Sequence, residues 1–269
     1  IKKDSSLYMA STLKKMGHSV YLTFADQNNY RSKITDLTVF DFDYEFLDDY
    51  YLKKIEVKQK TTLVFNEIIL QMRLDPPFDM HYLQILWMLD LFESQGMQVK
   101  NSPRGILRFS EKMTIERFHA PSIPSYFGSN AQSFKESVLD WKEQGYEDII
   151  LKPVNLFSGI GVEKLSIDTV NIESYFSQKV STLQGALVAQ PFLKAVYQGE
   201  KRALLYRGKH IGSILKKAVS GSFLANIAQG ASFEKTDIAE NLMIPLKEIS
   251  LAMMHEGVDF IAVDILDDK

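Results

Sequence analysis

Residues 149–161 read Ile-Ile-Leu-Lys-Pro-Val-Asn-Leu-Phe-Ser-Gly-Ile-Gly. The apolar residues 149–151 are typical of a buried strand, which Lys152 and Pro153 bring to an end. A lysine in this place can hold a nucleotide phosphate, while the small residues behind it let backbone N–H groups approach the phosphate oxygens. A lone Gly-x-Gly is more often a plain turn, so the loop is weak support by itself. It matches neither Gly-x-x-x-x-Gly-Lys-Ser/Thr nor Gly-x-Gly-x-x-Gly, which argues against the two nucleotide folds with those motifs.

The sequence on both sides of this loop alternates between helical and strand patterns. Upstream, a helix over 131–144 ends at Gly145. Downstream, we expect a strand at 162–165, a helix near 172–184, a buried strand at 186–190, and an antiparallel hairpin of 202–206 and 210–216 around Arg207-Gly208-Lys209. A polar loop to about 233, a helix over 236–256 interrupted by Pro245, and a strand over 260–266 complete this half.

The first hundred residues show a second α/β pattern. Asp4 and Ser5 cap a helix whose apolar residues recur at helical spacing until Gly17. We expect strands at 19–24 and 97–100, a β-rich run at 63–70 and a helix over 80–95 that Gly96 ends, whereas residues 25–62 have no clean period. We therefore expect an N-terminal α/β domain over 1–104 and a mixed α+β domain over 105–269.

The composition limits the classes of function. The 269 residues are 45% apolar and 24% charged, with a net charge of −3, so they carry no basic footprint for nucleic acid. The absence of cysteine excludes disulfides and thiolate nucleophiles and fits a reducing cytoplasm. The most apolar run, 83–92, contains Asp90 and is too short to span a membrane. Because the chain opens on Ile1, we expect further residues upstream.

Three charged residues stand at strand positions in the C-terminal half. Asp264 lies within Ile261–Leu266, where an ionised carboxylate needs a cation or several donors to offset its desolvation. Magnesium with ATP phosphates would serve, and an aspartate that caps a turn is an equal alternative. Arg202 begins a strand and suits the charge that develops on a transferring phosphoryl group, with Lys216 assisting. A solvated cationic surface is the competing interpretation for these two residues.

Residues 73–79, Arg-Leu-Asp-Pro-Pro-Phe-Asp, join one arginine and two carboxylates to two rigid prolines. This combination predicts a recognition loop in which Arg73 binds a substrate carboxylate bidentately. An ion pair of Arg73 with Asp75 or Asp79 is the structural alternative. The histidines lack metal-ligand spacing, and no Gly-x-Ser-x-Gly elbow occurs, so histidine–metal and serine-hydrolase chemistry have little support.

Taken in order, five segments resemble the bacterial-type glutathione synthetase family of ATP-grasp ligases. They are Ile1–Ser6, Met72-Arg73 with Asp75–Asp79, Ile150–Pro153, Gly199–Arg202 and Val263–Ile265. The resemblance implies an ATP-grasp fold, of α/β and α+β class, in which ATP lies between two α+β pieces beside an N-terminal α/β (pre-ATP-grasp) domain. The lid piece is expected at about 113–189 and the C-terminal piece at about 190–269.

The resemblance also implies a reaction and its residues. ATP phosphorylates the glycyl-accepting carboxylate of γ-glutamylcysteine, and the amine of glycine then displaces phosphate, so the protein acts mainly by positioning and charge stabilisation. Arg202 and Lys216 would be catalytic, and Asp264 would bind Mg²⁺, with Mn²⁺ possible. Expected ATP-binding residues are Lys112, Lys152, Ser158, Gly159, Gln190, Phe192, Leu193 and Glu200, and expected substrate-binding residues are Asp4, Ser5, Arg73, Asp75 and Asn226. A cytoplasmic homo-oligomer is expected.

The sequence departs from the family pattern at several of these places. Leu156 and Ser158 replace glycines of the phosphate loop, and Leu224 replaces an arginine of the substrate loop, beside Ala225 and Ala231 in place of glycines. The family's Glu-x-Asn metal motif is expected beyond Lys269. Two further hypotheses therefore stay open. One is an ATP-grasp ligase for another carboxylate and amine, and the other is a nucleotide-binding homologue without catalysis.

Overall fold

The computed structural model describes residues 4–25, 36–48, 52–118, 122–225 and 230–267. The chain forms two compact units. The first contains Ile1–Asp75 and Met80–Pro103, and the second contains Arg104–Lys269 together with the short segment Pro76–Asp79. The segment around the cis Pro76–Pro77 bond thus belongs with the second unit, although its sequence neighbours on both sides belong to the first. The domain boundaries given above stay a prediction.

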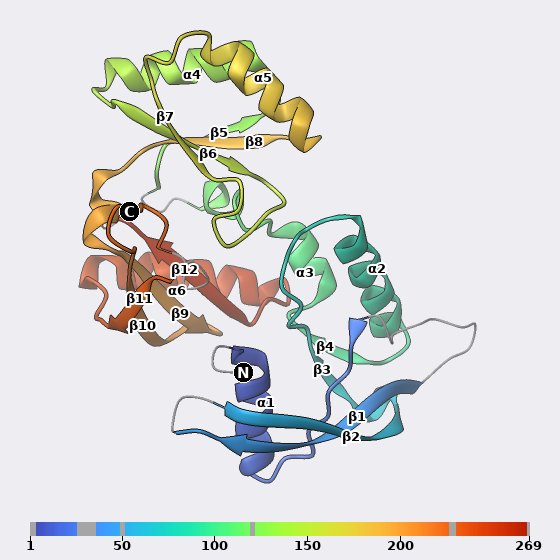
Figure 1. The fold of residues 1–269 in the computed structure, drawn as a ribbon. Coiled ribbons are helices and arrows are strands. Elements are labelled where there is room, and N and C mark those ends of the chain that lie inside the picture. The colour runs from blue at the N-terminus through green and yellow to red at the C-terminus, as the bar shows by residue number, and fades with distance from the viewer. Residues whose placement is uncertain (1–3, 26–35, 49–51, 119–121, 226–229, 268–269) are drawn as a thin grey trace. The chain divides into compact units, whose positions relative to one another are not determined.

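The first unit combines two helices with two small sheets (Figure 1). Helix α1 (Ser5–Lys15) begins where the Asp4 carboxylate accepts hydrogen bonds from the backbone N–H groups of Ser6 and Leu7, as a good N-cap does. An antiparallel pair consists of β1 (Asp36–Phe46) and β2 (Leu52–Val64), and a parallel pair consists of β3 (Ile69–Gln71) and β4 (Gln98–Lys100). Helix α2 (Met80–Ser94) connects the parallel strands, and a 3₁₀ turn, η2 (Phe65–Glu67), precedes β3.

Two sequence predictions in this unit were wrong or incomplete. The strand expected at 19–24 is reduced to one bridge, in which Leu22 and Phe40 exchange backbone hydrogen bonds. The unassigned stretch 25–62 instead contains most of the two long strands β1 and β2. Strand β2 has no buried face to produce an alternating pattern, because nearly all of its side chains are exposed or half-buried.

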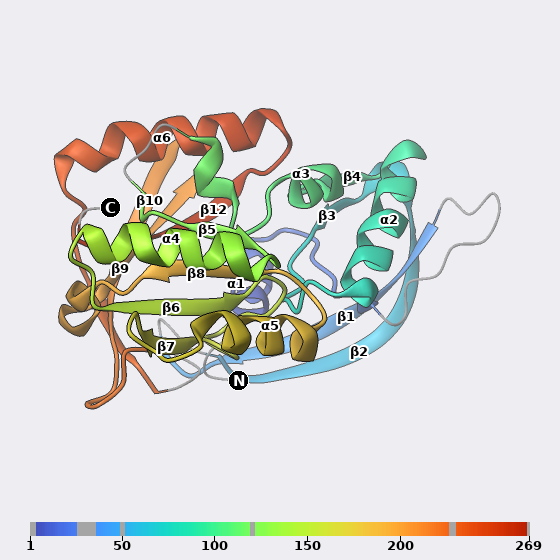
Figure 2. The same ribbon diagram turned by 90° about the horizontal axis from the view of Figure 1, so that it is seen from above.

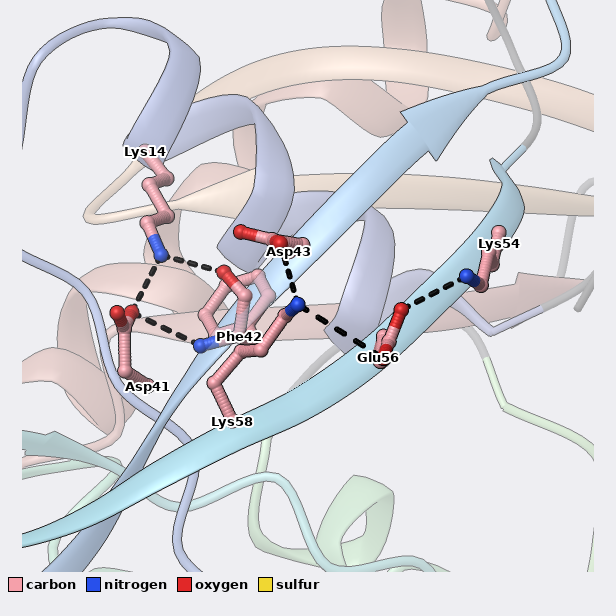
Figure 3. Close-up of polar contacts among 7 residues, drawn as sticks. All are labelled: Lys14, Asp41, Phe42, Asp43, Lys54, Glu56 and Lys58. Atoms are coloured by element: carbon pink, nitrogen blue, oxygen red, sulfur yellow. Dashed lines mark hydrogen bonds and ion pairs between the residues drawn. The ribbon is translucent and has the colours of Figure 1, made fainter.

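Polar contacts tie α1 to the β1–β2 pair (Figure 3). The Lys14 ammonium donates to an Asp41 carboxylate oxygen at 2.5 Å and to the Phe42 carbonyl at 2.5 Å. It also lies 4.5 Å from the centre of the Phe42 ring, which is fully buried. On the neighbouring strand, Lys58 pairs with Asp43 at 3.0 Å. The hydrogen bond from Lys14 holds the pKa of Asp41 below its usual value.

The second unit begins with a four-stranded antiparallel sheet in the order β5-β8-β6-β7. Its strands are β5 (Tyr126–Gly128), β6 (Asp148–Pro153), β7 (Glu163–Ser166) and β8 (Leu187–Pro191). Helices α4 (Ala131–Glu143) and α5 (Ile172–Leu183) lie side by side over one face of this sheet (Figures 1 and 2). The apolar core beneath them includes the stacked rings of Phe134 and Phe176, 4.2 Å apart, packed with Ile149 and Leu151 of β6.

A second four-stranded sheet has the order β11-β10-β9-β12. Its strands are β9 (Glu200–Tyr206), β10 (Lys209–Lys217), β11 (Ser232–Lys235) and β12 (Phe260–Ile265), and helix α6 (Glu240–His255) packs on one face. Positive φ angles at Arg207 and Gly208 form the predicted hairpin turn. Shorter pieces are α3 (Pro103–Arg108), η3 (Thr114–Arg117) and η4 (Lys194–Gln198).

Two sequence predictions for the C-terminal part of the chain were wrong. Part of the expected polar loop is β11, whose four side chains are all exposed, so that it lacks an apolar signal. Helix α6 begins at Glu240 rather than at 236, and it continues through Pro245 instead of being interrupted there. In the described part of the chain, no helix combines the length and the apolar run needed to cross a bilayer.

Candidate active site

Four charged side chains share one face of the second sheet. On β9, Glu200 and Arg202 are two residues apart and therefore point to the same side. Pairing places Lys216 of β10 directly opposite Glu200, and Asp264 of β12 directly opposite Arg202. The alternate residues of β9, such as Ala203, pack against α6 on the other face. Strand register alone thus gathers two cations and two carboxylates on the face away from α6.

Short contacts connect these four groups. The guanidinium of Arg202 holds Asp264 bidentately, with 2.7 Å from Nε to Oδ1 and 2.6 Å from Nη2 to Oδ2. The Lys216 ammonium lies 3.0 Å from the same Oδ1 and also contacts the Glu200 carboxylate. The Lys216 side chain is only 5% exposed, so both carboxylates compensate a cation that has lost most of its water.

Burial and neighbouring charges shift the pKa values of Glu200 and Asp264 in opposite directions. Desolvation by the surrounding chain raises the pKa of Glu200, and the neighbouring charge of Asp264 raises it further against the pull of Lys216. Desolvation also acts to raise the pKa of Asp264, but the hydrogen bonds and charges of Arg202 and Lys216 outweigh it and lower that pKa. The hydrogen bonds and charges of Arg202 and Lys216 favour the ionised form of Asp264, which suits a ligand for a hard cation.

Lys152 lies on the face of β6 that is turned away from α4 and α5. Its neighbours on the strand, Leu151 and Ile149, belong to the core under those helices, so Lys152 points to the other side. Its ammonium donates to Oε1 of Gln190 at 2.6 Å, and the Gln190 amide donates to Ser125 Oγ at 2.8 Å. Desolvation lowers the pKa of Lys152, although the nearby charges of Glu200 and Asp264 oppose the shift. Lys152 is thus electrostatically coupled to the charged face of the second sheet.

Lys112 lies beside the loop that follows β6. Its ammonium donates to the Leu156 carbonyl at 2.5 Å and to the Val154 carbonyl at 3.4 Å. The loop that it contacts carries positive φ angles at Ser158, Gly159 and Gly161. Successive residues in this conformation can turn their N–H groups toward an anion.

The segment expected to line adenine joins the two sheets. Phe192 is buried with Ile150 and Val196, and partly buried Leu266, which follows β12, packs against this cluster. The Lys164 ammonium lies 4.2 Å from the centre of the Phe192 ring. The Phe192 side chain therefore belongs to the core between the sheets, while Leu193 beside it is only half-buried.

The predicted substrate residues at the N-terminus come together within the first unit. Arg73 donates from Nη2 to Ser5 Oγ at 3.0 Å and from Nε to Ser6 Oγ at 3.2 Å. The guanidinium thus lies at the N-terminal end of α1, where helix N–H groups favour an anion. Asp4 caps this helix, and Asp75 is exposed. Asn226 lies outside the described residues.

Two participants were missed from the sequence. Ser125 holds Gln190, and the charge of Glu111 influences both Lys152 and Arg202. Ser125 lies in no motif, and Glu111, although it precedes Lys112, carries no signal in the sequence for this electrostatic influence. In the described ranges, no group of three or more histidine, aspartate or glutamate residues is placed to hold a metal ion. The carboxylate chemistry still fits a hard cation, because phosphate and water oxygens commonly complete a magnesium shell.

Comparison with known proteins identifies the family. Residues 1–107 match the model of the prokaryotic glutathione synthetase N-terminal domain, and residues 111–269 match that of its ATP-grasp domain. Glutathione synthetase from Ralstonia nicotianae is 24% identical over 269 residues, covering 100% of this chain and 81% of that protein. The Prochlorococcus marinus enzyme is 29% identical over 196 residues, covering 73% of this chain but only 62% of the relative.

A solved structure shows the same fold at low identity. The macrocyclase MdnC from Microcystis aeruginosa, bound with its precursor peptide MdnA, matches with a TM-score of 0.60 and 12% identity, over 99% of this chain and 85% of that one. The fold is therefore ATP-grasp, as the resemblance implied. Because the two family models together cover nearly the whole chain, it belongs to the prokaryotic glutathione synthetase family, ATP-dependent ligases that join γ-glutamylcysteine to glycine.

Proposed function

We propose that this chain performs the family's ligation with the charged face of the second sheet and Lys152 as its phosphoryl-transfer site. The observation that carries the proposal is the convergence of Arg202, Lys216 and Asp264 by strand register, in electrostatic reach of Lys152. Phosphoryl transfer leaves little covalent chemistry to a protein, so fixed charges around the transferred group supply most of the acceleration. Lys152, Arg202 and Lys216, together with the carboxylate of Asp264, are suited to that task.

Each of these residues has a distinct part in the proposal. Lys152 holds an ATP phosphate, exchanging its bond with Gln190 for one with phosphate oxygen. Arg202 stabilises the charge of the transferring phosphoryl group, and Lys216 assists while keeping Glu200 and Asp264 in place. The N–H groups around Ser158 and Gly159 cradle phosphate oxygens. The backbone near Leu193 contacts adenine, because the Phe192 ring is already buried.

Asp264 would hold a magnesium or manganese ion, which supplies charge neutralisation to the phosphates when bound. In the present arrangement both Asp264 oxygens accept from Arg202 and one also meets Lys216. A divalent cation at this carboxylate therefore competes with two protein cations for the same oxygens. Arg202 donors that are released from Asp264 would be available to the phosphoryl group.

The carboxylate substrate is proposed to bind at the end of α1. Arg73, already held by Ser5 and Ser6, presents its guanidinium beside helix N–H groups that favour negative charge. Asp75 would bind the substrate's amino group, and Asn226 is proposed as a further substrate-binding residue. A cytoplasmic homo-oligomer is also part of the proposal, supported by the lack of cysteine and by the family.

Phosphate release from ATP tests the function directly. The protein is supplied with γ-glutamylcysteine and glycine, singly and together, in the presence of Mg²⁺. We expect turnover only with both substrates, because glycine must displace phosphate from the acyl phosphate for the cycle to continue. ATP binding without turnover on any pair would instead favour a non-catalytic homologue.

Leu224 supports a second candidate within the same chemistry. It stands where the family has an arginine of the substrate loop, so that one charge for the substrate is missing. A ligase for a different carboxylate or amine is the alternative. Turnover with a γ-glutamyl peptide other than γ-glutamylcysteine, or with another amino acid in place of glycine, would favour this alternative.

A further inference from the structure

Helix α6 carries two stripes of side chains on opposite sides. The buried residues Leu242, Leu246 and Ile249 recur at helical spacing and belong to the core of the second sheet. The opposite side keeps the same spacing but faces solvent. We call it the outer stripe, and it consists of Glu240, Ile244, Lys247, Glu248, Leu251 and His255. Only Leu251 among these is half-buried, while Ile244 is 70% exposed.

A hollow of about 400 Å³ lies beside the outer stripe. Ile244 and Leu251 of α6 line it together with Leu205 of β9 and Gly208 of the hairpin turn. A Cβ atom at position 208 would come within 2.7 Å of Leu251 Cδ2, so glycine lets the turn approach the helix this closely. A single exposed apolar residue is ordinary, but Ile244 stands at the rim of an apolar hollow. The surface thus offers a knob and a hole next to each other.

The order of residues along the outer stripe complements itself. We consider a second α6 that lies antiparallel to the first, with a two-fold axis between positions 247 and 248. Ile244 then faces Leu251 of the second copy, and Lys247 faces Glu248 of the second copy. Two-fold symmetry repeats both pairs. The ends also match, because Glu240 faces His255 of the second copy.

Other registers of the same pair lose this match. If the second helix is moved by one turn toward one end, Ile244 faces Lys247 or Glu248 instead of Leu251. If it is moved by one turn the other way, Ile244 comes opposite His255 or passes Leu251 altogether. An apolar side chain opposite a charged one forces the charge to lose water without a partner. Charge and apolarity therefore select one register.

We propose that the outer stripe of α6 is an interface at which two copies of this chain pair about that two-fold axis. Ile244 of the second copy covers the hollow beside Leu251, so that apolar surface leaves water on both sides. A second copy is the occupant because the pattern matches itself. The inference goes beyond the proposed ligation and assigns a face to the homo-oligomer. The charged face of the second sheet is turned away from α6, so pairing leaves it open.

The association of the full chain in solution tests the proposal. Sedimentation equilibrium over a range of concentrations gives the Kd of pairing. In Ile244→Glu a carboxylate replaces the knob and meets Leu251 of the second copy, so we expect Kd to rise at least about tenfold. Val170→Glu is the matched control, because Val170 is 84% exposed and lies outside α6. It should keep the wild-type Kd.

Charge reversal tests the register. Lys247→Glu sets a carboxylate opposite Glu248 twice in each pair, and Glu248→Lys sets two lysines opposite Lys247. Each should raise Kd by roughly tenfold, because two attractive pairs become two repulsive ones. The double variant exchanges the charges and should return Kd to within about threefold of wild type. Circular dichroism checks that every variant is folded.

Three results would overturn the proposal. They are a wild-type chain that stays monomeric at about 0.1 mM, an unchanged Kd in Ile244→Glu, and a double variant that pairs no better than the single reversals. The measurement needs neither nucleotide nor substrate. A failure of pairing is therefore distinct from a failure of the ligase assay.

Discussion

At Arg202, two guanidinium nitrogens donate to Asp264 within the proposed phosphoryl-transfer site. Arg202→Met removes that cation without adding a polar group. We expect kcat for phosphate release to fall by roughly 10²–10³-fold, the usual effect of losing one preorganised donor, with a smaller change in KM for ATP. Steady-state assays over a range of ATP concentration would measure both constants.

Lys201→Met is the matched control, because Lys201 is the next residue of β9 and projects from the opposite face. The control should keep the wild-type kcat. A wild-type kcat in Arg202→Met would remove Arg202 from the proposed mechanism. Equal losses in both variants would point to damage of the strand instead.

The lowered pKa of Lys152 predicts a pH dependence of ATP binding. Desolvation lowers the pKa of Lys152 below the ordinary lysine value of 10.5, so its ammonium loses a proton at a lower pH than a free lysine does. The anionic phosphates prefer the protonated form, so ATP affinity should fall as pH rises through this lowered pKa. In Lys152→Arg the cation persists, since arginine stays protonated, and the alkaline loss of affinity should move to higher pH. Titration calorimetry across the alkaline range checks this, and identical profiles would contradict it.

Some of the site could be predicted residue by residue, and some could not. Lys152 and Asp264 were identified because a charged group at the end of an apolar strand needs a partner. Arg202 and Lys216 were also named from their strand positions, but the pairs Glu200–Lys216 and Arg202–Asp264 could not be predicted, because they depend on strand register. Register is set by the packing of the opposite face against α6, and a single sequence does not display that packing.

At the scale of elements, prediction succeeded where one face is buried and the ends are marked. Helix α4 has three buried residues at helical spacing and ends before Gly145, whose φ is +87°. Strand β2 was missed because its charged and polar side chains face solvent on both sides. Strand β11 was missed for the same reason. The periodic spacing of apolar residues arises because one face of an element is buried. An element without a buried face therefore cannot be predicted from this spacing.

Loop 153–161 gives a prediction about an element. Gly161→Ala would place a Cβ at a φ of +70° and within 2.8 Å of Pro153. We expect a loss of at least about 1 kcal/mol in the free energy of unfolding, together with weaker ATP binding. Gly185→Ala is the control, since a Cβ there would meet only the Leu183 carbonyl at 3.8 Å. Urea denaturation measures the stability of both variants, and equal midpoints would contradict the expectation.

The contact of α1 with the β1–β2 pair depends on Lys14 (Figure 3). Lys14→Met should lower the free energy of unfolding by about 1 kcal/mol, because the Phe42 carbonyl and Asp41 lose a charged donor. Lys58→Met, which removes exposed ion pairs on the neighbouring strand, should have a smaller effect. Thermal denaturation of both variants compares them, and a larger loss for Lys58→Met would contradict the ranking.

The sign of the acid dependence at Asp41 follows from its lowered pKa. Its stabilisation is fully present above the ordinary aspartate value of 3.8 and is lost as pH falls through the lower folded value. In Lys14→Met the pKa of Asp41 should return toward 3.8. The stability difference between wild type and variant should therefore shrink only in strongly acidic solution. A difference that disappears near neutral pH would contradict this.

At the scale of the whole molecule, the residues proposed to bind the nucleotide and those at the end of α1 proposed to bind the substrate carboxylate lie in different compact units. Lys152, Arg202 and Asp264 of the proposed phosphoryl-transfer site all belong to the second unit, whereas Ser5 and Arg73 of the proposed substrate site belong to the first. The segment Pro76–Asp79 belongs to the second unit, and its Phe78 N–H donates to the Asn155 carbonyl of the phosphate loop. Phe78 and Asn155 thus lie in contact within the same unit.

This division predicts where each ligand stabilises the chain. A ligand at 100 times its Kd stabilises the structure that binds it by about 2.7 kcal/mol. Mg²⁺ and ATP should therefore slow hydrogen exchange at β6, β9 and β12, and leave β1 and β2 at the rate of the free protein. γ-Glutamylcysteine alone should instead slow the amides at the start of α1, near Arg73. Exchange measured by mass spectrometry with each ligand separately would distinguish the two patterns. Uniform slowing of both units by ATP alone would show that they respond as one cooperative body, and would contradict the assignment of the nucleotide to the second unit.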